Sequence, residues 1–173
     1  TNRGLSNSII EGVGTVLERH DRIIVIEDDM ELSRGFLSYM NAALARYAGE
    51  SAVMQVSGHM FDVPAFVGRD RALFLPLTTS WGWATWRRAW ATFDAAAPGW
   101  QDLRGDRGLR RRFNIDGAYD YASMLERQMS GVGDSWAIRW HWSVFRAGGV
   151  SLFPPVSMVR NTGMDGSGTH GRG

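Results

Sequence analysis

Four consecutive β-branched residues, Ile23 to Ile26, are followed at once by the carboxylates of Glu27, Asp28 and Asp29. An uninterrupted β-branched run of this length is typical of a short strand covered on both faces, as in a parallel sheet. In open α/β sheets, ligands bind beyond the carboxyl ends of the strands. The stretch therefore predicts an acidic cluster that holds a cation and, through it, an anionic ligand. The alternative is that the acids solvate a loop and favour the first turn of the next helix.

The composition limits the class of protein. A chain of 173 residues, 44% hydrophobic and 21% charged, is typical of one globular domain, which we place at 1–173. No run approaches the roughly 18 apolar residues of a transmembrane segment, and the first residues lack a signal-peptide pattern. We expect a cytoplasmic protein, with a peripheral position at the inner face of a bacterial membrane as the alternative. The net charge of +1 argues against generic nucleic-acid binding.

The absence of cysteine from the sequence excludes disulfides, zinc–thiolate sites and thiol nucleophiles. Any metal must therefore use oxygen or imidazole ligands. Aspartate oxygens suit Mg²⁺ or Mn²⁺, which engage one or two carboxylates together with substrate phosphates.

Apolar periodicity predicts helices and strands that alternate along the chain, as in an α/β fold. Helices are expected over 5–19, 36–47, 83–90, 119–129 and 136–147, and strands over 22–26, 52–57, 72–77, 150–153 and 156–159. Residues 98–117, rich in glycine and arginine, are the least core-like segment. A strand that should precede the first helix is missing, so we expect the chain to be a fragment of a larger domain.

A tryptophan-rich segment follows the third predicted strand. Trp83, Trp86 and Trp90 share one face of the expected helix, which favours a core position. Trp81 and Gly82 precede that helix, and a glycine there permits close approach of a ligand or of another part of the backbone. Trp81 and Trp83 are accordingly the tryptophans predicted to contact a substrate, the others being core.

Several polar residues are candidates for the chemistry of the site. Asp29, last of the acids, is the predicted metal ligand, and Asp28 would point the opposite way, towards a ribose, if the extended geometry persists. Asp134 precedes a helix, where it is either a general base or a plain N-cap.

The histidines divide by their position in the chain. Gly58 and His59 follow the second predicted strand at the same sheet edge and are predicted to touch an acceptor. His170, on a glycine-rich tail, is a candidate imidazole ligand. His20 and His141 are expected to be structural.

The chain carries an Arg-Gly-Leu start before a helix, a strand ending in Glu27-Asp28-Asp29, a Met-Glu-Leu-Ser segment before a Phe-Leu-Ser-Tyr-Met helix, a Val-Ser-Gly loop, and Ser80-Trp81-Gly82-Trp83. This order resembles the GT-A-fold glycosyltransferases, particularly N-acetylglucosaminyltransferase I and related bacterial sugar transferases. The similarity extends over nearly the whole chain. It is most specific in the acidic triplet, the Ser-Trp-Gly-Trp turn and Asp134-Ser135-Trp136.

The resemblance implies an α/β three-layer sandwich with a mixed, mostly parallel sheet that lacks its first βα units. The acidic triplet corresponds to the family's DXD-type motif, so that Asp29 would bind Mn²⁺ or Mg²⁺ while Asp28 and Glu27 meet the nucleotide. It further implies that Gly82 and Trp83 lie against the donor sugar. Asp134 would then be the base of an inverting displacement, and His170 would complete the metal site.

The leading hypothesis is therefore a metal-dependent, inverting glycosyltransferase that moves a sugar from a nucleotide-diphosphate donor to a carbohydrate or other hydroxyl acceptor. A sugar-phosphate nucleotidyltransferase of the same fold is an alternative, although it would need a glycine-rich phosphate loop that the sequence does not contain. A catalytically silent carbohydrate-binding domain built on tryptophans is the third hypothesis.

Overall fold

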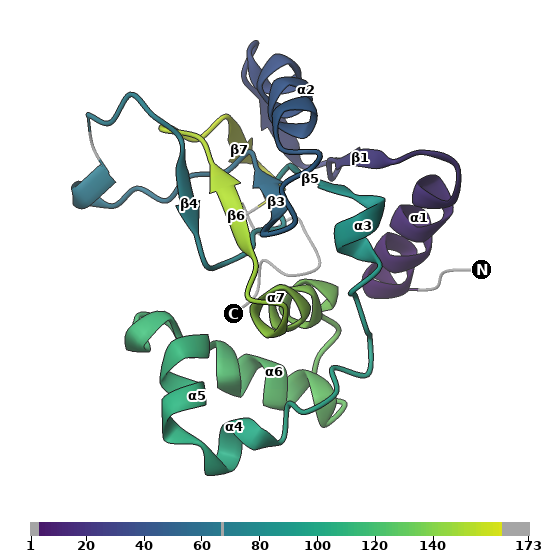
Figure 1. Ribbon diagram of the computed structural model, residues 1–173, viewed down its shortest axis with the longest axis vertical. Coiled ribbons are helices and arrows are strands. Elements are labelled where there is room, and N and C mark those ends of the chain that lie inside the picture. Colours follow the sequence, from purple (N-terminus) through teal and green to yellow (C-terminus); the bar gives the residue numbers. More distant parts are fainter. Residues whose placement is uncertain (1–3, 67, 164–173) are drawn as a thin grey trace.

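The structure, a computed structural model, describes residues 4–66 and 68–163 (Figure 1). The helices are α1 (Leu5–Arg19), α2 (Phe36–Arg46), α3 (Arg87–Trp90), α4 (Asp102–Gly105), α5 (Arg107–Phe113), α6 (Tyr121–Met129) and α7 (Trp136–Arg146), with the 3₁₀ turns η1 (Pro64–Phe66) and η2 (Ile115–Gly117). The strands are β1 (Arg22–Val25), β2 (Met30–Leu32), β3 (Val53–Ser57), β4 (Leu73–Leu75), β5 (Trp83–Trp86), β6 (Val150–Phe153) and β7 (Val159–Asn161). Among these described helices, none combines the length and the apolar character needed to cross a membrane.

Five strands form the main sheet in the order β1-β5-β3-β6-β4, and β2 and β7 form a separate antiparallel ribbon. Strands β3 and β6 are parallel, whereas β5 is antiparallel to both β1 and β3, and β4 is antiparallel to β6. The mixed sheet expected from the sequence is confirmed. Among the described strands, only β3 and β6 pair in parallel. The other three pairings of the main sheet are antiparallel, because each involves β4 or β5, which run opposite to β1, β3 and β6.

The direction of the strands determines where their ends meet. Strands β1, β3 and β6 run the same way, since β1 and β3 are both antiparallel to β5 and β3 is parallel to β6. Their carboxyl ends therefore share one edge of the sheet, together with the beginning of β5. The segments that follow β1 and β3 and precede β5 are consequently neighbours in space.

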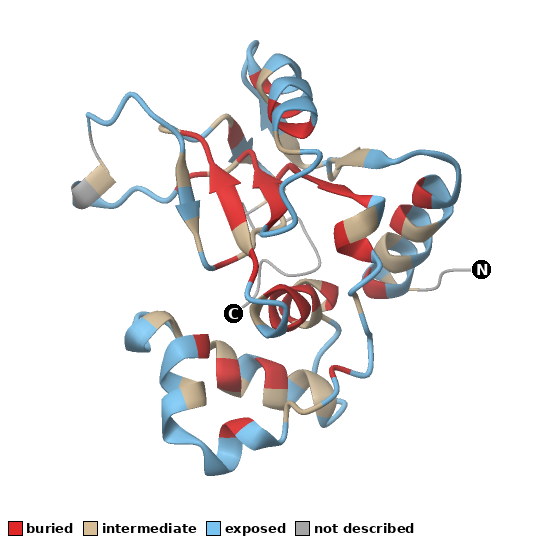
Figure 2. Cartoon of the chain, in the orientation of Figure 1, coloured by how far each residue is buried: buried red, intermediate tan, exposed pale blue. Residues whose placement is uncertain are grey.

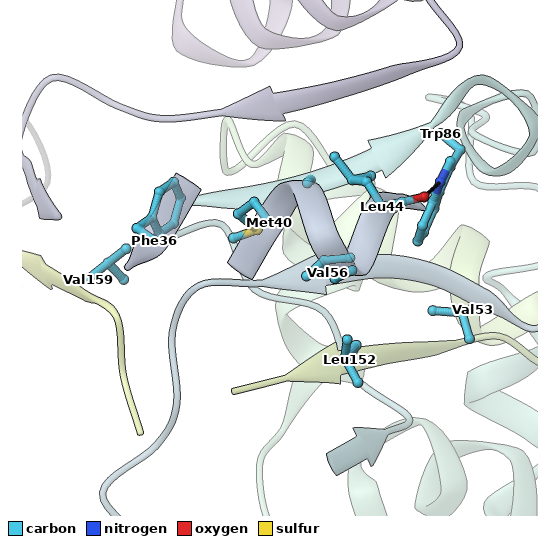
Figure 3. Close-up of a cluster of buried hydrophobic side chains, with 10 residues drawn as sticks. Phe36, Met40, Leu44, Val53, Val56, Trp86, Leu152 and Val159 are labelled. Atoms are coloured by element: carbon cyan, nitrogen blue, oxygen red, sulfur yellow. Dashed lines mark hydrogen bonds between the residues drawn. The ribbon is translucent and has the colours of Figure 1, made fainter. Parts of the chain in front are cut away.

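Helix α2 covers one face of the sheet (Figures 1 and 2). Its buried residues Phe36, Met40 and Leu44 pack on side chains from β3, β5 and β6 (Figure 3). The indole Nε1 of Trp86 in β5 donates a hydrogen bond to the carbonyl oxygen of Leu44 at 3.0 Å. This bond satisfies a buried donor and joins the helix to the sheet.

The opposite face is covered by α1, α3 and α7. A second cluster joins Val13 and Leu17 of α1 to Trp83, Trp136 and other tryptophans. Trp83 is stacked on Trp136 with ring centroids 5.0 Å apart. Two layers of helices therefore enclose the sheet, as in a three-layer α/β arrangement.

Helix α7 is buried on two sides. Its Trp136, Trp140 and Val144 face the sheet cluster, while Ile138 and Trp142 pack against α4, α5 and α6. In Figure 1, α7 accordingly lies between the sheet and these three helices. The segment expected to be least core-like thus contributes a core of its own, which includes Leu103 and Phe113.

Residues 83–90 differ from their predicted helical state. The segment 83–86 is strand β5, and only 87–90 is helical. In a strand, alternate side chains face opposite sides of the sheet. Trp83 accordingly lies in the cluster beneath α1 and α7, and Trp86 lies in the cluster beneath α2. The helical spacing of the three tryptophans was therefore misleading, because two of them serve opposite faces of one strand.

Strand β1 also differs from its prediction in one respect. Its Ile23 packs towards one layer and Ile24 towards the other, as expected of a strand covered on both faces. Both residues are nevertheless only partly buried, since β1 is the outermost strand of the described sheet. The β-branched run therefore correctly predicted that both faces of the strand are covered. It could not indicate that the strand lies at an edge of the sheet.

The core position of Trp83 predicts a stability effect that half-buried Trp81 does not share. Trp83 is 0% exposed, so we expect Trp83→Ala to lower the free energy of unfolding by about 3–5 kcal/mol. Trp81→Ala, which removes a half-buried ring, should cost about 1 kcal/mol. Urea denaturation followed by circular dichroism measures both values. Equal losses in the two variants would contradict the assignment of Trp83 to the core.

Candidate functional site

The acidic triplet, the histidine loop and the tryptophan turn meet at the carboxyl edge of β1 and β3. Trp83, the first residue of β5, is paired with Val25 at the end of β1 and with Ser57 at the end of β3. The residues just outside these positions are Glu27–Asp29, Gly58–His59 and Trp81–Gly82. The strand pairing thus brings together three of the segments that the sequence marked separately.

The acids lie in a tight turn rather than in a continued extended segment. The amide of Met30 donates to the carbonyl oxygen of Glu27 at 3.2 Å, which makes Asp28 and Asp29 the two central residues of a β-turn. The condition under which Asp28 and Asp29 would point opposite ways is not met, because the extended backbone ends before them. Asp28 is exposed and Asp29 is half-buried.

Asp29 is held by the residues that follow β7. Its carbonyl oxygen accepts hydrogen bonds from the amide and the hydroxyl of Thr162, both at 2.9 Å. A Cβ at Gly163 would lie 2.6 Å from Oδ2 of Asp29, so only a glycine allows the backbone to pass this close. The Oδ1 atom is shielded from solvent and makes no hydrogen bond within the described part of the chain.

An orphaned carboxylate oxygen in a backbone cradle is a suitable ligand for a hard cation, because burial without a partner is otherwise unfavourable. Within residues 4–66 and 68–163, no group of three His, Cys, Asp or Glu side chains could surround a metal. Asp29, with Asp28 beside it in the turn, would supply one or two carboxylates, the number that Mg²⁺ or Mn²⁺ uses when it is bound jointly with phosphates. The other predicted ligand, His170, lies outside the described residues.

Gly58 and Gly82 join two loops at this edge. The Gly58 amide donates to the Gly82 carbonyl oxygen at 2.7 Å. A Cβ at Gly58 would lie 2.5 Å from Cε2 of Phe36, and one at Gly82, whose φ is +54°, would lie 2.8 Å from Cγ1 of Val159. The close approach predicted at Gly82 is therefore made by side chains of the protein, those of Val159 and Phe36. Both glycines position the loops that carry His59 and Trp81.

The two tryptophans of the turn have different surroundings. Trp83 is 0% exposed and stacked within the core. Contrary to the prediction, its ring therefore presents no surface to a donor sugar. Trp81 is half-buried, and its ring meets His59 edge to face with centroids 4.7 Å apart. Trp81 alone of this pair presents ring surface to a ligand.

The tautomer of His59 follows from its neighbours. Burial lowers the pKa of the imidazole, which favours its uncharged form. The hydroxyl of Ser157 donates its single proton to the carbonyl oxygen of Val159 at 2.8 Å, so Nδ1 of His59 must donate to the Ser157 oxygen at 3.2 Å. The Nε2 atom then carries a free lone pair, which can accept a hydrogen bond from a ligand hydroxyl.

Asp134 is not the N-cap of α7. The cap is Ser135, whose hydroxyl accepts from the amide of Ile138 at 3.4 Å. Asp134 is exposed, and a Cβ at Gly4, which precedes α1, would lie 3.2 Å from its Oδ2 atom. Burial lowers the pKa of nearby Arg139, whereas the charge of Asp134 raises it. The capping alternative is removed, because Ser135 occupies the N-cap position.

A cleft of about 400 Å³ opens beside this edge, within the range of small-molecule sites. Its walls include His59 and Trp81 from the sheet edge, Tyr121 from α6, and Ser135 and His141 from α7. The sheet edge and the first turns of α7 therefore face a common space. Asp134 precedes the lining residue Ser135 in the chain but does not itself line the cleft, and its Oδ2 atom lies near Gly4.

His141, which was expected to be structural, is packed in the core and also borders the cleft, which the sequence did not indicate. The side chain is 3% exposed, lines the cleft and stacks on Phe113 with ring centroids 4.9 Å apart. Burial lowers its pKa to about 4, and the Phe113 backbone opposes this shift in part. Apart from this interaction with the Phe113 backbone, neither ring nitrogen has a hydrogen-bond partner among the described residues. The signal in the sequence was an imidazole flanked by Trp140 and Trp142.

No protein-family model matches the chain, and no curated protein sequence matches it. The interpretation of the site therefore depends on its residues and their geometry.

The buried His141 predicts a pH dependence of stability. Its folded pKa of about 4 lies below the ordinary value of 6.5, so the unfolded chain binds a proton between these values while the folded chain does not. The free energy of unfolding should therefore fall by about 3 kcal/mol as the pH drops from 6.5 to 4. Urea titrations at several pH values measure the fall.

The variant His141→Phe provides the control for this prediction, because it keeps the aromatic packing and removes the titrating group. Its unfolding free energy should lose less over the same pH range, by the amount assigned to His141. Parallel curves for the two proteins would show that His141 does not titrate as described.

Proposed function

We propose that this protein is a metal-dependent, inverting glycosyltransferase of the GT-A type that transfers a sugar from a nucleotide-diphosphate donor to a hydroxyl acceptor. The observation that carries the proposal is the half-buried Asp29, with an orphaned Oδ1 atom, at the carboxyl end of β1. Bound Mn²⁺ or Mg²⁺ would neutralise the charge that develops on the diphosphate leaving group. The resemblance to GT-A enzymes supports the same assignment.

Each residue of the acidic turn would contact a different part of the donor complex. Asp29 would hold the cation through Oδ1, since that oxygen has no other partner among the described residues. Asp28 is exposed next to it, free to accept hydrogen bonds from the ribose hydroxyls. Glu27, which precedes these two residues, would contact the nucleotide as well. Gly163 permits the chain after β7 to lie against Asp29, which orients the carboxylate without competing for Oδ1.

Asp134 is the proposed general base. It is exposed, is not used as a helix cap, and directly precedes Ser135, which lines the cleft where His59 and Trp81 lie. Its carboxylate would accept the proton of the acceptor hydroxyl as that oxygen bonds to the anomeric carbon. The bond from the anomeric carbon to the phosphate oxygen breaks on the opposite side, and the nucleoside diphosphate leaves with the electron pair.

A catalytically silent carbohydrate-binding domain is the second candidate. The aromatic cleft favours it, since Trp81 and its neighbours would bind a sugar without any metal. A carbohydrate-binding domain would not explain why the Oδ1 atom of Asp29 is shielded from solvent without a hydrogen-bond partner among the described residues. The glycosyltransferase accounts for both features and is preferred for that reason.

The metal role of Asp29 predicts a loss of turnover. Asp29→Asn keeps the shape of the side chain but removes its negative charge, so Mn²⁺-dependent transfer from nucleotide sugars should fall by at least about 100-fold. Asp70→Asn is the matched control, because Asp70 is a carboxylate that is 93% exposed beside Arg71. An unchanged rate in the Asp29 variant would refute the metal assignment.

The base role of Asp134 predicts a lower rate with little change in donor binding. Asp134→Asn should lower kcat by about 10²–10⁴-fold while the affinity for nucleotide and Mn²⁺ is retained. His59→Gln tests the competing base, and we expect it to affect mainly the acceptor KM. If His59→Gln abolished kcat and Asp134→Asn did not, the proton would pass to His59 instead.

A further inference from the structure

The cleft beside the sheet edge has no charged lining. Within the described part of the chain, none of the side chains that line it is Asp, Glu, Lys or Arg. An anionic ligand placed there would lose hydration without gaining a compensating charge. The diphosphate of a nucleotide sugar therefore belongs to the acidic turn with its cation, and the cleft is suited to a neutral ligand.

The lining combines ring faces with hydroxyl and imidazole groups. Trp81 forms an aromatic corner with His59, which also meets Phe61 edge to face at 5.0 Å. Tyr119 and Tyr121, with centroids 4.8 Å apart, form the facing wall. Apolar ring faces bordered by a few polar groups fit a ligand whose two faces carry C–H groups and whose rim carries hydroxyl groups.

Two imidazoles supply directional contacts in this cleft. Because Nδ1 of His59 donates its proton to Ser157, the Nε2 atom has a free lone pair. His141 lies deeper, 3% exposed, and apart from the Phe113 backbone its ring nitrogens have no hydrogen-bond partner among the described residues. Because the ring lines the cleft and has two nitrogens, at least one of them can bond to a ligand that brings its own donor or acceptor.

We propose that this cleft binds one neutral sugar ring, stacked on Trp81, with its hydroxyls bonded to His59 and to the deeper His141. That this sugar is the acceptor of the transfer rests on the proposed function, whereas the binding itself does not. His141 is then a specificity-determining residue, because a sugar without a hydroxyl at that depth leaves its nitrogens unpaired. The acceptor hydroxyl that reacts is the one directed towards Asp134.

The test is saturation-transfer NMR and calorimetry on the protein with a panel of neutral methyl glycosides. The corresponding hexuronic acids and hexose phosphates form the charged half of the panel. A neutral glycoside should bind without Mn²⁺, and its charged counterparts should bind at least about tenfold more weakly. Equal binding of the charged sugars, or no binding of any neutral glycoside at tens of millimolar, would overturn the proposal.

Three variants locate the binding. Trp81→Ala and His141→Phe should each weaken the preferred glycoside about tenfold or more, whereas Phe74→Ala, which removes a 46% exposed aromatic ring outside the cleft, should leave it unchanged. Should either cleft variant fail to fold, Ser80→Phe fills the cleft without removing a core contact. Undiminished sugar binding in Ser80→Phe or in Trp81→Ala would place the site elsewhere.

The same experiment separates this inference from the proposed function. Asp29→Asn should lose the affinity for Mn²⁺ with a nucleoside diphosphate and keep the affinity for the neutral glycoside. If the protein binds the glycoside but never the nucleotide, the transferase proposal fails and the cleft assignment stands. If it binds nucleotide and metal but no neutral sugar, the cleft assignment fails alone.

Discussion

The insertion of β5 between β1 and β3 is the constraint on which the site depends. Its register places Trp83 opposite both Val25 and Ser57, so the segments just beyond these three residues must lie together. The stacking of Trp83 on Trp136 anchors that register in the core. A shift by one residue would turn the ring of Trp83 out of its cluster, which makes any other alignment of the loops costly.

The site is divided by charge. The acidic turn gathers negative side chains around Asp29, whose Oδ1 atom is shielded, while the cleft beside it has no charged lining within the described residues. Under the proposed function, a cation bound at the acidic turn would attract the anionic donor, while the uncharged cleft would favour a neutral acceptor. Burial lowers the pKa of both His59 and His141, which favours their uncharged forms.

The glycines at the edge show how packing and site geometry are linked. Gly58 and Gly82 are hydrogen-bonded to each other and lie against Phe36 and Val159. They contact the protein and thereby bring the loops of His59 and Trp81 together. Gly163 passes beside Asp29 in the same way. Small residues in this structure act on the site indirectly, by allowing backbones to approach.

The sequence by itself determined the local elements whose signals are local. It placed α1 at 5–19, assigned strands near β3 and β6, and put the acids at a strand end, because hydrophobic periodicity and β-branching act over a few residues. Only the tertiary structure decided that Trp83 belongs to a strand, that Ser135 and not Asp134 caps α7, and that His141 borders a cleft. Those outcomes depend on pairing and packing between segments far apart in the chain, which no local pattern encodes.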